Sequence, residues 1–174
     1  KIPDGIYRAE GSIEQMKDQQ DVMIKAAIEV KGSDIIVDLN GSSPQVNWGG
    51  NVVYNFTYAY VFMAMKSMFG QDIPNNDGCA RPIKMSAPEG SVVNCKFPAA
   101  GAARLVIGHF LTEIIYRALS AVLPSRVIAA SGGTPAQMNV FYGKRNDGRP
   151  WHSVIIRGGG MGASSISDGN YVYI

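Results

Sequence analysis

Hydrophobic and polar side chains alternate along a stretch near the start of the chain. From Val22 to Val30 every second residue is apolar, and the charged side chains fall between them. A period of two with one polar face is typical of a half-buried strand. Gly32 and its polar neighbours then supply turn residues ahead of a second apolar run. Residues 21–31 and 35–39 are therefore predicted to form an antiparallel hairpin.

Other short apolar runs predict further strands. The sequence Asn146-Asp147-Gly148 favours a tight hairpin turn between the last two of them. The runs cover residues 7–10, 83–85, 91–93, 127–130, 138–142 and 152–156.

Two longer segments have the pattern of helices. Residues 51–69 contain neither proline nor glycine, are apolar on nearly all sides and stop at Gly70, which predicts a helix buried on most faces. Residues 102–122 carry apolar side chains three and four positions apart, and Pro124 ends that pattern. The order of elements predicts a single α+β domain over residues 1–174, with mainly antiparallel sheets and these two long helices.

Composition narrows the class of protein. The chain has 174 residues, of which 46% are hydrophobic and 17% charged, and this is enough for a sizeable core. A net charge of +2 without a marked basic cluster argues against binding to nucleic acid or to an anionic membrane surface. The longest apolar block, 58–65, is far shorter than the roughly 20 residues that span a membrane.

Cys79 and Cys95 show no metal-binding spacing. Two free thiols in a reducing compartment, and hence a cytoplasmic protein, are the preferred interpretation, and a disulfide between them is the alternative.

Three features could carry chemistry, and each has a structural alternative. His109, Glu113 and Arg117 are spaced four residues apart, so they could form an acid–base relay or an ion-pair stripe on a helix. The tract 74–78 could bind a cation, or its Asn and Asp side chains could form Asx turns. The glycine-rich stretch 157–163 could form an anion-binding nest, or another segment could approach its backbone closely. The sequence contains no serine-nucleophile elbow, zinc pattern or P-loop.

Short blocks in a fixed order resemble a known family. The chain opens with Pro-Asp-Gly-Ile-Tyr-Arg-Ala-Glu at 3–10, and the predicted hairpin leads into Asp-Leu-Asn-Gly-Ser-Ser-Pro-Gln at 38–45. Asn51 matches the asparagine that opens the family's long helix. These blocks resemble the second half of hydantoinase B/oxoprolinase-type subunits, which include N-methylhydantoinase B, 5-oxoprolinases and the large subunits of acetone and acetophenone carboxylases. Further matching blocks lie at 73–78, 81–83, 87–91, 98–100, 118–119, 123–127, 129–133, 158–163 and 168–169.

The resemblance implies that the chain is a C-terminal-half fragment of a larger subunit. In this family a partner subunit or domain of the hydantoinase A type uses ATP to activate the substrate, and the B-type subunit handles the activated species. The implied reaction is ATP-dependent hydrolysis of a cyclic amide of the hydantoin or 5-oxoproline type, or carboxylation of a ketone. The alternative is a non-catalytic assembly module or a small-molecule-binding module.

The resemblance also bears on cofactors and partners. It implies no cofactor in this chain, ATP and Mg²⁺ at the partner subunit, and room for a divalent metal in the missing N-terminal half of the parent. That half and the hydantoinase A-type subunit are the expected partners. Apolar faces left bare on an excised half favour a homo-oligomer. The chain alone is expected to be inactive.

The candidate substrate-binding residues are polar and lie in or beside the matched blocks. Arg104 begins a helix and could hold a carboxylate or phosphoryl group through two parallel hydrogen bonds. Turn formation or internal ion pairing, for example between Arg81 and Glu89, is the alternative role. No residue is assigned as catalytic or as a metal ligand. The candidates are Asp38, Asn75, Asn76, Arg81, Glu89, Arg104 and His109.

Overall fold

The computed structural model describes residues 2–14, 20–131 and 136–171. The chain divides into two compact units, residues 1–127 (unit 1) and residues 128–174 (unit 2). Each unit has its own sheet. The predicted α+β class is confirmed, and the organisation as one domain within a longer subunit stays a prediction.

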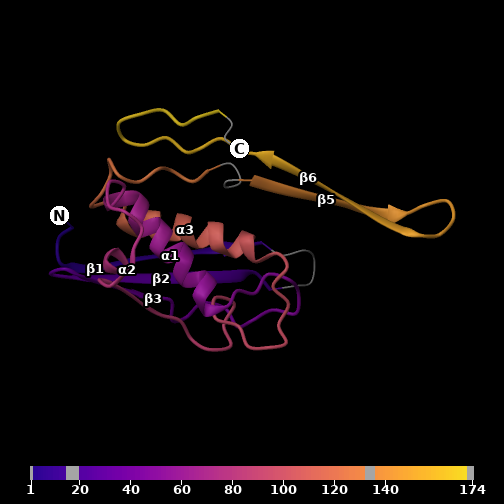
Figure 1. Cartoon of the computed structure of the whole chain (residues 1–174), viewed down its shortest axis with the longest axis horizontal. Helices are drawn as coiled ribbons and strands as arrows, with labels where there is room; N and C mark the ends of the chain where they lie inside the picture. The colour runs from indigo at the N-terminus through magenta and orange to yellow at the C-terminus, as the bar shows by residue number, and fades with distance from the viewer. Residues whose placement is uncertain (1, 15–19, 132–135, 172–174) are drawn as a thin grey trace. The chain divides into compact units, whose positions relative to one another are not determined.

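Unit 1 is built on a four-stranded sheet in the order β1-β2-β3-β4 (Figure 1). β1 (Gly5–Ile13), β2 (Val22–Lys31) and β3 (Asp34–Asp38) pair antiparallel. The predicted hairpin is therefore confirmed, and the strand predicted at 7–10 is longer at both ends. Alternate residues of β2 are buried, as its period of two predicts.

β4 (Ile83–Ser86) adds to the sheet in parallel with β3. Ile83 lies opposite Ile35, and Ser86 lies opposite Asp38. Parallel neighbours need a long crossover connection, and here that connection contains two helices. The sheet is thus mainly antiparallel, as predicted, with one parallel pair.

Two long helices, α1 (Tyr54–Phe69) and α3 (Arg104–Leu119), cover one face of this sheet (Figure 1). Both are shorter than the segments predicted from the sequence, 51–69 and 102–122. α1 starts later because the amide of Val52 donates to the Val92 carbonyl and its own carbonyl accepts from Cys95, each at 2.9 Å. These bonds hold Val52 outside the helix.

α3 starts later for a similar reason, because the Ala103 amide donates to the Gly49 carbonyl at 2.8 Å. At the other end, the amides of Val122 and Leu123 both turn back to the Leu119 carbonyl, which closes the helix. A short helix that the sequence did not predict, α2 (Asp77–Ala80), precedes β4.

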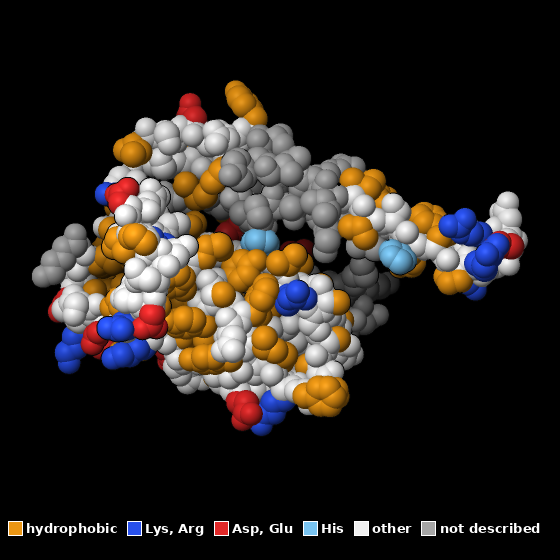
Figure 2. Space-filling view, in the orientation of Figure 1, with side chains coloured by type: hydrophobic (Ala, Val, Ile, Leu, Met, Phe, Trp, Pro, Cys, Tyr) orange, Lys and Arg blue, Asp and Glu red, His pale blue; other side chains and the backbone are white. Residues whose placement is uncertain are grey.

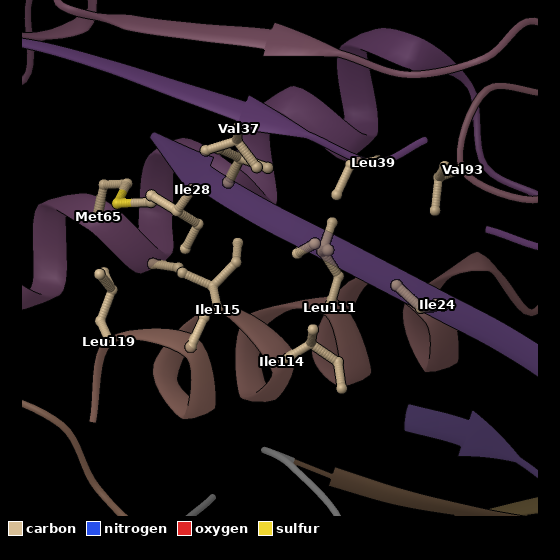
Figure 3. Close-up of a cluster of buried hydrophobic side chains, with 14 of the residues drawn as sticks. Ile24, Ile28, Val37, Leu39, Met65, Val93, Leu111, Ile114, Ile115 and Leu119 are labelled. Carbon is tan, nitrogen blue, oxygen red and sulfur yellow. The ribbon is translucent and has the colours of Figure 1, made fainter. Parts of the chain in front are cut away.

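The core of unit 1 lies between the sheet and the two helices. Large apolar side chains from β2, β3, α1 and α3 meet there, and nearly all are fully buried (Figure 3). Ile28 from the sheet and Ile115 from α3 are both 0% exposed. The labelled members of this cluster in Figure 3 are Ile24, Ile28, Val37, Leu39, Met65, Val93, Leu111, Ile114, Ile115 and Leu119.

Two of the predicted strands are wrong. Residues 91–93 form a turn in which Ser91 makes only isolated bridges, to Pro44 and to Asn94. Residues 127–130 have no strand partner along their length. The Val127 amide instead donates to the Leu123 carbonyl at 3.2 Å, which continues the turns after α3.

Unit 2 contains a long hairpin of β5 (Ala136–Lys144) and β6 (Pro150–Gly158), which pair antiparallel. The tip is closed by a bond from the Arg145 amide to the Arg149 carbonyl at 2.8 Å. Gly148 has a φ of 82°, the left-handed region that glycine tolerates best. The hairpin predicted around 146–148 is therefore confirmed, with longer strands than expected.

The glycine-rich stretch after β6 lies close to other backbone. The Met161 amide donates to the Asn170 carbonyl at 2.9 Å, and the Ala129 amide donates to the Ala163 carbonyl at 2.8 Å. A Cβ at Gly162 would collide with the Ala129 carbonyl. Close approach of another segment, one of the two interpretations of these glycines, is confirmed. The end of the matched block 129–133 lies outside the described residues.

Candidate functional site

The candidate binding residues lie at two opposite ends of unit 1. Because β3 and β4 are parallel, residues that precede β4 lie at one end of the sheet and residues that follow either strand lie at the other. Both long helices also begin at this second end (Figure 1). The first end holds Asn75, Asn76 and Arg81, and the second holds Asp38, Glu89, Arg104 and His109.

At the first end, the polar tract builds a helix cap. The Asn76 side chain accepts from the Cys79 amide at 3.2 Å and so caps α2. Arg81 forms an exposed ion pair with Asp77, with Nε 3.1 Å from Oδ2. Asn76 thus has a structural role as a helix cap and, in the described structure, does not form the predicted Asx turn with the Gly78 amide, and Asn75 is exposed beside it.

At the second end, Asp38 and Glu89 have local partners. Asp38 accepts from the Asn40 amide at 3.1 Å, which shapes the turn after β3. Glu89 pairs with Lys96, at 3.0 Å between Oε2 and Nζ. The predicted alternative of an ion pair between Arg81 and Glu89 is wrong, since each has a partner nearer in the sequence.

Arg104 and His109 lie together with two aromatic side chains of α1. The Arg104 guanidinium carbon is 5.4 Å from the centre of the Phe56 ring. The rings of Tyr60 and His109 meet edge to face, with centroids 5.3 Å apart. Phe56 and Tyr60 also contact each other, at 4.9 Å between centroids. These four residues are called the α1–α3 cluster.

The register of the two helices explains this arrangement. Phe56 and Tyr60 are four residues apart on α1, and Arg104 and Gly108 are four apart on α3, so each pair lies on one helix face. A Cβ at Gly108 would lie 2.6 Å from the Tyr60 ring, so only glycine leaves space for this ring. Two turns further along both helices, the hydroxyls of Ser67 and Tyr116 are 2.7 Å apart. This pair has the same separation in the sequence as Tyr60 and His109, so the two helices keep one register along this contact.

Partial burial perturbs two titratable groups of the α1–α3 cluster. Burial lowers the pKa of His109 below its usual value of 6.5, and the negative charge of Glu113 opposes this effect. Burial raises the pKa of the Tyr60 phenol, and the Arg104 charge opposes it. His109 is therefore neutral at pH 7, with a ring nitrogen able to accept a proton. Arg117, the end of the predicted stripe, donates to the Glu10 carbonyl at 3.0 Å.

The lowered pKa of His109 predicts a pH dependence of stability. Between pH 6.5 and the lower folded-state pKa, the unfolded chain binds a proton at His109 more readily than the folded chain does. Stability should therefore fall as the pH falls from 6.5 toward the lower folded-state pKa. Thermal unfolding between neutral and mildly acidic pH measures this, and the decline should be shallower in His109→Gln. Equal slopes in the two proteins would contradict it.

Asn51 is the polar residue whose role the sequence did not reveal. The sequence pattern predicts it within the long helix, but it precedes α1 and is 1% exposed. The two hydrogens of its amide nitrogen are shared among the carbonyls of Val46, Trp48 and Ala100, which lie 2.8 to 2.9 Å from Nδ2. Its amide oxygen accepts from the Val46 backbone at 2.7 Å. Asn51 thus joins the loop after β3 to the loop that leads into α3, the helix that begins at Arg104.

Two adjoining clefts of about 400 and 390 Å³ lie at the C-terminal end of α1. They share Ile35, Phe69 and Ile73; the wall of the second cleft is largely apolar, and that of the first also includes polar side chains. Lys66 lies in the second cleft and donates to the carbonyls of Gly70 and Ile73. Of the candidate residues only Asn76 lines either cleft.

The described part of the chain offers neither a metal-ligand cluster nor a membrane span. Within residues 2–14, 20–131 and 136–171, no three His, Cys, Asp or Glu side chains are close enough to hold a metal ion. Over the same ranges, no helix has the length and apolar character needed to cross a bilayer. Cys79 and Cys95 are both free thiols.

The family model for hydantoinase B/oxoprolinase matches residues 1–173. The chain belongs to the hydantoinase B/oxoprolinase family. A relative from Pseudomonas sp. (strain NS671), described as the B-type subunit of a D-/L-hydantoinase, is 33% identical over 97% of the chain. The chain spans only 30% of that relative's length.

Two solved structures share the fold. The ATP-dependent caprolactamase from Pseudomonas jessenii superposes with a TM-score of 0.76 and 22% identity over 97% of the chain. The nucleotide-free structure of an acetone carboxylase superposes with a TM-score of 0.71 and 18% identity, also over 97% of the chain. The chain covers 30% and 25% of these two proteins, respectively.

Proposed function

We propose that this chain forms one wall of a site in which an ATP-activated cyclic amide is hydrolysed or a ketone is carboxylated. The match of the hydantoinase B/oxoprolinase model over residues 1–173 carries the proposal. The caprolactamase and the acetone carboxylase that share its fold act on a cyclic amide and on a ketone, respectively, with ATP. ATP and Mg²⁺ bind at a hydantoinase A-type partner, which phosphorylates the substrate.

The start of α3 is the part of the chain that we assign to the activated substrate. Arg104 is exposed, and its one described polar contact is to the Gly101 carbonyl, at 3.2 Å. A cation at the positive end of a helix dipole is unfavourable for the helix itself, which supports a role in binding an anion. The guanidinium holds the phosphoryl or carboxylate group, and neutral His109 accepts a proton as the activated species is attacked.

The surroundings of the α1–α3 cluster support coverage by another part of the assembly. Val53, Leu105 and Val106 are 55%, 42% and 43% exposed beside it. On the face presented in Figure 2, patches of hydrophobic side chains lie over the middle of unit 1, and most of its charged side chains lie toward the edge. Exposed apolar surface of this kind marks sites of protein contact. The remainder of the longer subunit, the hydantoinase A-type partner or a second copy covers it.

Replacement of Arg104 tests this assignment. In the longer subunit, assembled with its ATP-using partner, Arg104→Ala should lower kcat/KM for substrate-dependent ATP hydrolysis by about 10- to 100-fold, because a charge-assisted hydrogen bond is lost. Arg104→Lys should retain part of the activity, since lysine keeps the positive charge but lacks the planar guanidinium that forms two parallel hydrogen bonds. Candidate substrates are hydantoin, 5-oxoproline, caprolactam and acetone.

Arg126→Ala is the matched control, because Arg126 is also exposed but lies in the cleft at the other end of unit 1. It should leave turnover unchanged. The unfolding midpoint should be the same in all three variants. Normal turnover in Arg104→Ala would remove Arg104 from the site.

A further inference from the structure

We infer that Phe56 and Tyr60 are positioning residues, which hold the Arg104 guanidinium and the His109 imidazole in place for the activated substrate. The inference rests on the proposed function of Arg104 and His109 and extends it to two residues on a different helix. The sequence pattern alone favours ordinary core packing for both aromatics. The structure places them half-buried at the surface, each against one of the two polar groups.

Phe56 supports Arg104 from one side. An arginine side chain on the surface is free to rotate, and ordering it on substrate binding costs entropy. Here the guanidinium lies over the Phe56 ring at 5.4 Å, while Nη1 donates to the Gly101 carbonyl. A cation–π contact of this kind holds the cation against the ring face and leaves guanidinium N–H groups that can pair with an anion. The ring and the Gly101 carbonyl thus hold the guanidinium in place before substrate arrives.

Tyr60 supports His109 in a different way. Its ring meets the imidazole edge to face, at an interplanar angle of 81°. It reaches this position only because Gly108 has no side chain, since a Cβ there would lie 2.6 Å from the ring. Glycine in a helix interior costs about 1 kcal/mol relative to alanine, so its presence indicates that the close approach of Tyr60 matters.

The same contact sets the environment of the His109 ring. The charge of Glu113 on α3 acts on it, the Tyr60 ring on α1 contacts it, and the Arg104 charge acts in turn on Tyr60. The Tyr60 ring keeps water from one side of the imidazole, and this favours the neutral form. Removal of the ring should expose His109 and return its pKa toward the usual value of 6.5.

NMR titration of the chain tests the role of Tyr60 without any enzymatic assay. The chain has only two histidines, His109 and His152, so the His109→Gln variant assigns the resonances. Tyr60→Leu should raise the pKa of His109, and Tyr60→Phe, which keeps the ring, should leave it nearly unchanged. Phe62→Leu is the matched control for the loss of a half-buried aromatic ring from α1, and should also leave it unchanged. A His109 pKa that is the same in Tyr60→Leu as in the parent chain would overturn the inference.

Kinetics of the full assembly test the roles of both Tyr60 and Phe56. In Tyr60→Leu the acid limb of the turnover–pH profile should move to higher pH, since neutral His109 is required. Phe56→Leu should raise KM about two- to fivefold with little change in kcat, the loss expected for one exposed cation–π contact. Phe56→Tyr should restore the normal KM. An unmoved acid limb or an unchanged KM would refute the positioning role, even where Arg104→Ala shows that the proposed site itself is correct.

Discussion

Asn51→Ala should lower the free energy of unfolding of unit 1 by about 3 kcal/mol or more, since several buried backbone groups lose their partner. Asn51 is 1% exposed and bonds to the carbonyls of Val46, Trp48 and Ala100 and to the Val46 amide. Alanine replaces none of these bonds, and the side chain is closed off from water. Asn51→Asp should be at least as harmful, because it turns a carboxylate oxygen toward three carbonyl oxygens.

Asn94→Ala is the matched control for this prediction. Asn94 is half-buried and makes one side-chain bond in the described structure, from Nδ2 to the Ala87 carbonyl at 2.9 Å. Its loss should cost only about 1 kcal/mol. Urea unfolding of the variants measures both values. A smaller loss in Asn51→Ala than in Asn94→Ala would show that the loops around Asn51 do not depend on its side chain.

Ile115→Ala should lower the free energy of unfolding by about 3 kcal/mol, because it removes three buried carbons and leaves a cavity. Ile115 is 0% exposed, and in Figure 3 it projects from α3 toward Ile28 on the sheet. The neighbouring side chains come from separate elements and cannot all move inward to fill the space. The loss therefore includes both the transfer free energy and a cavity term.

Leu105→Ala serves as the control on the same helix. Leu105 is 42% exposed, and its truncation should cost less than about 1 kcal/mol. Urea denaturation of the two variants under the same conditions gives the comparison. Similar midpoints for the two would contradict the placement of the core between the sheet and α3.

The local pattern of the sequence was sufficient for the elements whose partners are nearby. The period of two in 21–31 and the turn at Gly32 predicted the β2–β3 hairpin, and Asn146 to Gly148 predicted the β5–β6 turn. In each case the turn chemistry and the side-chain period act within a short stretch of chain. The predicted strand at 91–93 failed because its hydrogen bonds go to Ser43 and Val52, which the local pattern cannot show.

The candidate site depended on contacts between distant residues, and there the sequence was less informative. The sequence grouped polar residues in matched blocks, but the parallel pairing of β3 and β4 puts Arg81 and Arg104 at opposite ends of unit 1. Tyr60 and His109 meet through the register of two helices 49 residues apart in the sequence. One local signal was available, namely Gly108 within an otherwise regular apolar helix, which indicates a large neighbouring side chain.

Parallel assays of the chain alone and of the full assembly are the most direct test of the proposed function. Residues 1–174 would be compared with the longer subunit and its hydantoinase A-type partner, each given ATP, Mg²⁺ and either a cyclic amide or a ketone with bicarbonate. We expect substrate-dependent ATP turnover from the assembly and none from the chain alone. ATP-dependent ring opening or carboxylation by residues 1–174 on their own would contradict the view that this chain supplies only one wall of a shared site.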